Sequence, residues 1–202
     1  GSHDRERIGR RHSAILIDAG EAFGTAHHAT TEGCLVMLDR LVRRRRFGSV
    51  LDLGCGSGVL AIAAARVLPR ARVLAPDIDP VAIEVARENI RRNVAAPRVR
   101  TLTAAGLAHA RVRGAGPYDL VLANILAGPL ITLAPAMAGV VRPGGRAVLS
   151  GILAEQAREV WATYVAAGFR LEARRVRNGW ATLVLVRQPR IRCATRRSRV
   201  RG

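Results

Sequence analysis

A glycine-rich segment holds the residues best placed to bind a ligand. It runs DLGCGSG from Asp52 to Gly58, between an apolar strand expected over residues 50–53 and an apolar helix expected over residues 59–68. Glycines at such a turn let the backbone approach a ligand closely. A dinucleotide site has the pattern GxGxxG and places a pyrophosphate on the helix N-terminus. An acid two residues before Gly54 is unfavourable beside a pyrophosphate. The candidate binding residues Asp52, Gly54, Gly56 and Gly58 therefore favour a ligand with a cationic amino-acid end, such as S-adenosylmethionine.

A carboxylate at the end of the second predicted strand is the expected partner of this loop. Asp77 follows Gly54 by 23 residues. A carboxylate at this position can accept two hydrogen bonds from a ribose diol. Asp79 is better explained as the cap of a helix over residues 79–92, with Pro80 in its first turn. Asp52 is expected to orient the loop or to hold the ligand's amine, directly or through water, rather than to do chemistry.

Asn124 is the candidate for contact with a reacting amine. It follows an apolar strand predicted over residues 118–123, and ligands bind at the carboxyl ends of strands in such sheets. Many amino-group methyltransferases carry Asn-Pro-Pro-aromatic here, and the amide oxygen accepts a bond from the target amine. This chain has Asn124-Ile125-Leu126-Ala127. The missing aromatic argues against a flipped base and for an aliphatic amine as substrate. The alternative is that Asn124 only caps a turn.

The three cysteines indicate neither a metal site nor a disulfide framework. Cys34, Cys55 and Cys193 are scattered and form no CxxC pair. Cys55 is expected to fill a small apolar space, although a place near a helix N-terminus could lower its pKa. No His or second Cys is placed to make it a nucleophile. We expect no bound metal and a reducing, cytoplasmic location.

Alternating strands and helices predict a doubly wound α/β sheet that ends in a hairpin at Asn178-Gly179. A strand-like run over residues 13–18 and a loop over residues 20–31 come first. Further strands are expected over residues 50–53, 72–75, 99–103, 118–123, 145–149, 171–177 and 180–186, and helices over residues 31–42, 59–68, 79–92, 130–141 and 154–167.

The charge suggests a polyanionic partner but does not identify one. The chain has 202 residues and a net charge of +18, and its 33 basic residues are all arginine. Arginines neutralise phosphates, yet an excess of Arg, Ala and Gly also fits a GC-rich genome. The run Arg43–Arg46 fits a solvated helix end. Arg187 and six later arginines carry part of the charge at the C-terminal edge and tail. No transmembrane helix or signal peptide is expected.

Five segments resemble the ribosomal protein L11 methyltransferase (PrmA) family. They are AFGTAHHATT, LDLGCGSGVLAIAAA, DIDPVAIEVARENIRRN, YDLVLANILAGPL and PGGRAVLSGIL, and the resemblance covers roughly residues 13–187. It implies a Rossmann-like class I methyltransferase with a mostly parallel seven-stranded sheet that ends in an antiparallel hairpin. It also implies S-adenosylmethionine as the cofactor. The substrate would be lysine ε-amines, and an N-terminal α-amine, of a ribosomal protein at the stalk base of the large subunit.

The resemblance also assigns site residues. Thr31, Gly54, Asp77 and Asn124 match the family's cofactor contacts, and Thr25 would line the pocket near the methionine end. His28 matches the histidine of the FGT motif, so it is a candidate proton acceptor beside Asn124; a loop-ordering hydrogen bond is the alternative. Ala26 stands where the family has Gly, which could strain this loop.

The expected organisation is one catalytic domain with two appendages. Residues 1–13 would be a charged lead or linker, residues 14–187 the methyltransferase domain, and residues 188–202 a basic, disordered tail able to make weak contact with RNA. Family members carry an additional N-terminal domain that recognises the substrate. We expect a monomer without membrane contact. The alternatives are a methyltransferase of RNA, DNA or another protein, an NAD-dependent oxidoreductase, and a non-catalytic ribosome-associated module.

Overall fold

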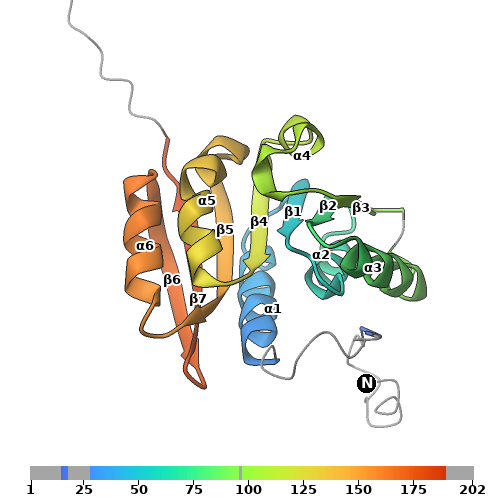
Figure 1. Ribbon diagram of the computed structural model, residues 1–202, viewed down its shortest axis with the longest axis horizontal. Helices are drawn as coiled ribbons and strands as arrows, with labels where there is room; N and C mark the ends of the chain where they lie inside the picture. Colours follow the sequence, from blue (N-terminus) through green and yellow to red (C-terminus); the bar gives the residue numbers. More distant parts are fainter. Residues whose placement is uncertain (1–14, 18–27, 96, 190–202) are drawn as a thin grey trace, which may run out of the picture.

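Strands and helices alternate along the chain (Figure 1). The computed structural model describes residues 15–17, 28–95 and 97–189. The helices are α1 (His28–Val42), α2 (Val59–Val67), α3 (Pro80–Arg92), the short 3-10 helix η3 (Gly106–Ala108), α4 (Ala110–Gly114), α5 (Ala127–Val140) and α6 (Ala157–Ala166). The strands are β1 (Ser49–Leu53), β2 (Arg72–Asp77), β3 (Val99–Thr103), β4 (Tyr118–Asn124), β5 (Val141–Leu153), β6 (Phe169–Arg177) and β7 (Trp180–Arg187).

The seven strands form one sheet in the order β3-β2-β1-β4-β5-β7-β6, which can be followed across Figure 1. All pairs are parallel except β5 with β7 and β6 with β7. The predicted class I methyltransferase fold, with its seven-stranded sheet and final antiparallel hairpin, is confirmed. The strand order reverses between β1 and β4, and ligands bind at the carboxyl ends of the strands beside such a switch point.

Two apolar layers cover the two faces of the sheet. Successive side chains of a strand point to opposite faces. Val50 of β1 therefore packs in one core cluster with α1, α2 and α3, and Leu51 packs in the other with α5 and α6. Leu120 and Val121 of β4 divide between the same two clusters. Both central strands are buried on both faces, which explains their continuous apolar sequences.

Several predicted boundaries differ from those in the structure. Helix α1 begins at His28 rather than Thr31, so part of the predicted loop is helical. Strand β5 extends from Val141 to Leu153, beyond both ends of the strand predicted over residues 145–149. Helix α5 begins at Ala127 and places Pro129 in its first turn, where a missing N–H costs no helical hydrogen bond.

The strand predicted over residues 13–18 is not present in its described part, residues 15–17. The side chain of Asn93, at the end of α3, binds this segment instead. The N–H of Leu16 donates to Asn93 Oδ1 at 3.0 Å, and Asn93 Nδ2 donates to the Leu16 carbonyl at 2.6 Å. An amide side chain thus satisfies backbone groups that a neighbouring strand would otherwise pair.

Candidate active site

The glycine loop is held against the end of β2 by backbone hydrogen bonds. The N–H groups of Gly54 and Cys55 both donate to the Pro76 carbonyl, at 3.0 and 3.1 Å. Gly54, Gly56 and Gly58 have φ angles of 68°, 53° and 79°, in the left-handed region that favours glycine. A Cβ at Gly54 would also lie 2.7 Å from Ile125 Cγ2. Backbone geometry and the neighbouring loop both require glycine at this position.

Asp52 orders the start of α2 from within the core. Gly58 occupies the N-cap position and has no side chain, and Asp52 Oδ2 accepts a hydrogen bond from the Ala61 N–H at 2.8 Å instead. Asp52 is 1% exposed. Burial raises the pKa of Asp52 to about 7, the Ala61 hydrogen bond opposes the shift, and the negative charge of Asp77 adds to it. Its carboxylate is in place to position the glycine loop.

Asp77 links the glycine loop to the start of α3. Its Oδ2 accepts from the Gly56 N–H at 2.8 Å, and its Oδ1 accepts from the Asp79 N–H at 3.1 Å. Asp79 in turn accepts from the Val81 N–H at 2.8 Å, which confirms the predicted helix cap. The carboxylate of Asp77 therefore stands at the rim of the loop with both oxygens held by backbone groups.

Two apolar side chains beside Asp77 are exposed and were not predicted as site residues. Ile78 is 71% exposed and Val81 is 64% exposed. Neither belongs to the core clusters. The sequence did contain a signal for this surface. Ile78 directly follows the acid at the end of a strand, and it lies outside the apolar period of the helix that follows. These side chains give this rim of the sheet an apolar surface next to a carboxylate.

Asn124 carries the most informative polar atom of the site. Its Nδ2 donates to Thr31 Oγ1 at 3.2 Å, across 93 residues of sequence. Its Oδ1 is buried and has no hydrogen-bond partner within the described residues. Leaving a buried acceptor unpaired costs about 1–3 kcal/mol, and such groups call for an explanation. Helix α1 and strand β4 together hold this oxygen at the carboxyl end of the sheet.

Ile125 fixes the direction of the loop after β4. A Cβ at Gly54 would contact its side chain, and a Cβ at Gly151, in β5, would overlap its backbone carbonyl oxygen. Gly151 also has a φ of 80°. The loop is therefore packed between the glycine loop and β5. Leu126, the next residue, is 67% exposed, so an apolar side chain projects from the loop two residues after Asn124.

Helix α1 lies close enough to the sheet to bring Thr31 to Asn124. A Cβ at Gly33 would overlap Thr182 Oγ1, a hydroxyl buried in β7. Thr182 Oγ1 and Ser150 Oγ lie 3.0 Å apart and share a hydrogen bond. Only glycine at position 33 permits this approach. The sequence gives no local sign of it, because the two residues are 149 positions apart.

The described cysteines are buried thiols. Burial raises the pKa of Cys34 to about 12, with a smaller contribution from the charge of Asp52. Burial also raises the pKa of Cys55, as do the negative charges of Asp52 and Asp77. The suggestion that a helix N-terminus could lower the pKa of Cys55 is wrong, because desolvation and two nearby carboxylates outweigh it. Cys193 lies outside the described residues.

Part of the predicted site cannot be placed. Thr25, Ala26 and His27 lie outside the described residues, and of His28 only its position as the first residue of α1 is described. Across residues 15–17, 28–95 and 97–189, no three His, Cys, Asp or Glu side chains gather where a metal ion could sit. In the same part of the chain, no helix is both long and apolar enough to span a membrane.

The sequence and fold are similar to those of known methyltransferases. A model of the ribosomal protein L11 methyltransferase (PrmA) family matches residues 2–188. The ribosomal protein L11 methyltransferase of Rhizobium etli is 54% identical over 183 residues, which cover 91% of this chain and 62% of that protein. That of Rhizobium rhizogenes is 51% identical over 187 residues, 93% of this chain and 64% of that protein. The chain thus spans less than two thirds of these relatives. The crystal structure of a ribosomal protein L11 methylase from Lactobacillus delbrueckii subsp. bulgaricus matches with a TM-score of 0.76 and 30% identity, over 87% of this chain and 86% of that one.

Proposed function

Because the chain belongs to the ribosomal protein L11 methyltransferase family, we propose that it transfers a methyl group from S-adenosylmethionine to an amine of ribosomal protein L11. The lysine ε-amine is the target class, with the N-terminal α-amine as a second target. We place the catalytic domain at residues 14–187 and the reaction in the cytoplasm, with the protein acting as a monomer. The single observation that carries the proposal is the buried Oδ1 of Asn124 beside the glycine loop, which accepts no hydrogen bond from the residues that the structure describes.

The residues around the loop fit the parts of S-adenosylmethionine. Asp77 would accept hydrogen bonds from the ribose hydroxyls, and the exposed Ile78 offers an apolar surface to the adenine. The backbone of Gly54 and Gly56 would approach the methionine end, with Asp52 holding the loop through the start of α2. Thr31 and Asn124 face each other across this end of the site. The remaining assigned binding residues are Gly58, from the pattern of the glycine loop, and Thr25, from the resemblance to the family.

Asn124 would position the acceptor amine. S-adenosylmethionine supplies an electrophilic methyl on a sulfonium, so the protein's main task is to orient the reactants. The Asn124 oxygen would accept a hydrogen bond from a neutral amine and align its lone pair with the methyl carbon. The N–C bond forms as the C–S bond breaks, and S-adenosylhomocysteine leaves. The oxygen would also stabilise the charge that develops on nitrogen.

The amine must lose its proton before it can attack. A protonated amine has no lone pair, and a neighbouring sulfonium charge favours its deprotonation. We assign His28 as a candidate acceptor of that proton, from the match to the family's FGT motif. The exposed Leu126, two residues after Asn124, offers an apolar contact for the aliphatic stem of a lysine.

Changing Asn124 to Ala tests the proposal. Turnover should fall at least 100-fold while the affinity for S-adenosylmethionine stays within a few-fold, because the oxygen acts on the amine. Stability should change by less than about 1 kcal/mol, since the loss of the Thr31 bond and the removal of an unpaired buried oxygen offset each other. The measurements are labelled methyl transfer to purified L11, calorimetric cofactor binding and thermal melting. Near-normal turnover in a folded variant would contradict the role of Asn124.

The same assay separates the rival functions. Methyl transfer to RNA or DNA but not to protein would establish a nucleic-acid methyltransferase. No transfer to any ribosomal fraction by a folded protein would indicate a non-catalytic module. Thermal stabilisation by a nicotinamide dinucleotide, but not by S-adenosylmethionine, would indicate an oxidoreductase.

A further inference from the structure

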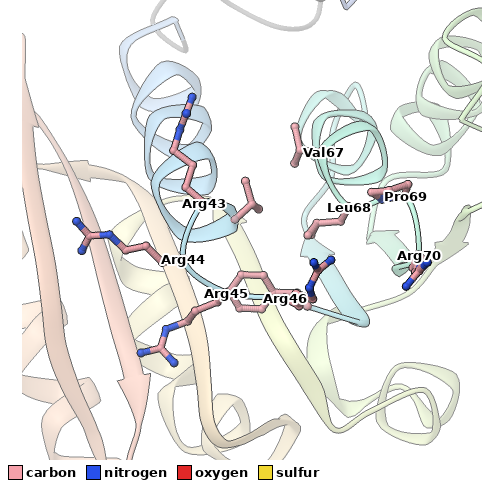
Figure 2. A pocket seen from close by; sticks show the side chains of 10 residues that line it. Arg43, Arg44, Arg45, Arg46, Val67, Leu68, Pro69 and Arg70 are labelled. Carbon is pink, nitrogen blue, oxygen red and sulfur yellow. The ribbon is translucent and has the colours of Figure 1, made fainter.

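An arginine-lined cavity of about 640 Å³ lies at the end of β1 opposite the glycine loop. The chain that leaves α1 and the chain that leaves α2 line it from two sides (Figure 2), and its lining also includes the apolar residues Phe47 and Leu68. We call this the arginine cavity. Its five arginines are Arg43, Arg44, Arg45, Arg46 and Arg70, all of them exposed. The sequence explained Arg43–Arg46 only as a solvated helix end, and the proposed reaction uses none of these residues.

The positive charge of the arginine cavity is only partly compensated. Arg43 forms an ion pair with Asp39 at 2.8 Å. The other four have no acidic partner within the part of the chain that the structure describes. Helices α1 and α2 both end here, and two helix C-termini supply about one negative elementary charge between them. Asp119, beside Gly48, is already bound to the Gly48 and Ser49 N–H groups and to Arg142. About three positive charges therefore remain.

The guanidinium groups are spread over the arginine cavity rather than gathered at one position. Figure 2 shows Arg46 and Arg70 extending beside Leu68 and Pro69, whereas Arg44 and Arg45 extend in the opposite direction. Arg43 and Arg44 lie in the turn that follows α1, where the N–H groups of Arg44 and Arg45 donate to the Leu41 carbonyl at 3.1 and 3.0 Å. Guanidinium groups also match phosphate geometry through paired N–H donors. Several separated guanidinium groups of this kind fit a polyanion that carries more than one phosphate.

We propose that the arginine cavity binds the phosphodiester backbone of RNA. The choice of RNA among polyanions rests on the proposed function, because that substrate is a ribosomal protein. The phosphate chemistry is independent of it. The five residues of β1 span about 16 Å, so RNA bound here would leave the glycine loop and Asn124 accessible. The site would hold the enzyme near RNA without delivering a base to the reaction centre.

Paired charge removal tests this site. The probe is a fluorescein-labelled 12-nucleotide single-stranded RNA, followed by anisotropy from 50 to 200 mM KCl without S-adenosylmethionine. The variant Arg46→Gln/Arg70→Gln is compared with the control Arg158→Gln/Arg170→Gln, which removes two exposed arginines from α6 and β6. Both retain the arginine-rich C-terminal sequence, so its contribution cancels. Thermal melting verifies that both variants fold.

We expect the cavity variant to bind at least tenfold more weakly at 100 mM KCl. Its salt slope should fall by about 1.4, or about 0.7 for each lost contact with a single strand. A loss of threefold or more that exceeds the control's supports the site, and any smaller or equal loss overturns it. Tighter binding of DNA of the same sequence, or displacement by polyglutamate at equal charge, overturns the assignment to RNA. Methyl transfer by the same variants reports separately on the proposed function.

Discussion

The burial of Asp52 could not be predicted from the residues around it. Nothing around DLGCGSG shows that this carboxyl is buried and bound to the Ala61 N–H. The sequence did indicate that it orients the loop rather than doing chemistry. Its raised pKa comes from burial by layers that are assembled from distant parts of the chain. The role of a residue such as Asp52 can therefore be predicted from the local sequence, whereas its pKa depends on the packed fold.

The raised pKa predicts how Asp52 changes stability with pH. A carboxyl whose folded pKa lies above its unfolded value binds more protons in the folded state. Its contribution is fully present below pH 4 and is lost as the pH rises to about 7. Relative to Asp52→Asn, which keeps an acceptor for Ala61, the wild-type free energy of unfolding should fall by up to about 4 kcal/mol across this window. Urea unfolding from pH 4 to pH 8 measures it.

Asp39→Asn provides a control of opposite sign. The hydrogen bond from Arg43 lowers the pKa of this exposed carboxyl. Any contribution of Asp39 is therefore present at neutral pH and is lost as the pH falls. The prediction for Asp52 fails if its difference curve is flat between pH 4 and pH 7, or if it slopes in the same direction as that of Asp39.

The helices and strands could be predicted where the apolar pattern is regular. They could be predicted less well where contacts between distant parts of the chain determine where an element begins or ends. The core strands and helices follow their apolar runs. The start of α1, the length of β5 and the segment at residues 15–17 do not. In the last case, Asn93 replaces a strand partner. The contact of Thr31 with Asn124 likewise depends on how α1 docks on β4, β5 and β7. No local pattern encodes that docking.

Gly33→Ala should displace α1 from the sheet. The added methyl would overlap Thr182 Oγ1, and overpacking of this kind costs about 1–3 kcal/mol. The displacement should also weaken the Thr31–Asn124 contact, and on the proposed mechanism turnover would fall about tenfold. Urea unfolding and methyl-transfer assays report the two effects.

The matched control is Gly139→Ala, at a helical glycine of α5 where the added Cβ would meet no heavy atom within 4 Å apart from its chain neighbours and the backbone of its own helix. Alanine should stabilise that helix by up to about 1 kcal/mol, because it lowers the entropy lost on folding. Equal effects of the two substitutions would show that α1 tolerates the methyl and that the approach to Thr182 is not required.

At the scale of the whole molecule, Arg187 connects the last strand, β7, to the elements packed beside it. The sequence indicated only a basic edge, but this side chain is buried. It donates to the carbonyls of Ala138 in α5, at 3.2 Å, and of Gly168 before β6, at 2.8 Å. Its guanidinium also lies 5.6 Å from the centre of the Phe169 ring. One cation therefore joins the last strand to a helix and a turn.

Arg187→Ala should lower the free energy of unfolding by about 2–4 kcal/mol, because it leaves buried carbonyls with fewer donors and removes a packed side chain. Arg170→Ala, on the exposed side of β6, should change it by less than about 0.5 kcal/mol. The midpoint of urea unfolding compares the two. A similar midpoint for both variants would show that Arg187 does not hold the C-terminal side together.

The separation of the two ends of β1 has an evolutionary consequence. Substitutions more than about 10 Å apart with no shared partners have nearly additive effects. The glycine loop and the arginine cavity lie at opposite ends of that strand. Selection can therefore act on mutations in the arginine cavity independently of the residues in the glycine loop, and the reverse. Descendants of this sequence can lose or move the arginines while the chemistry of the loop is inherited unchanged.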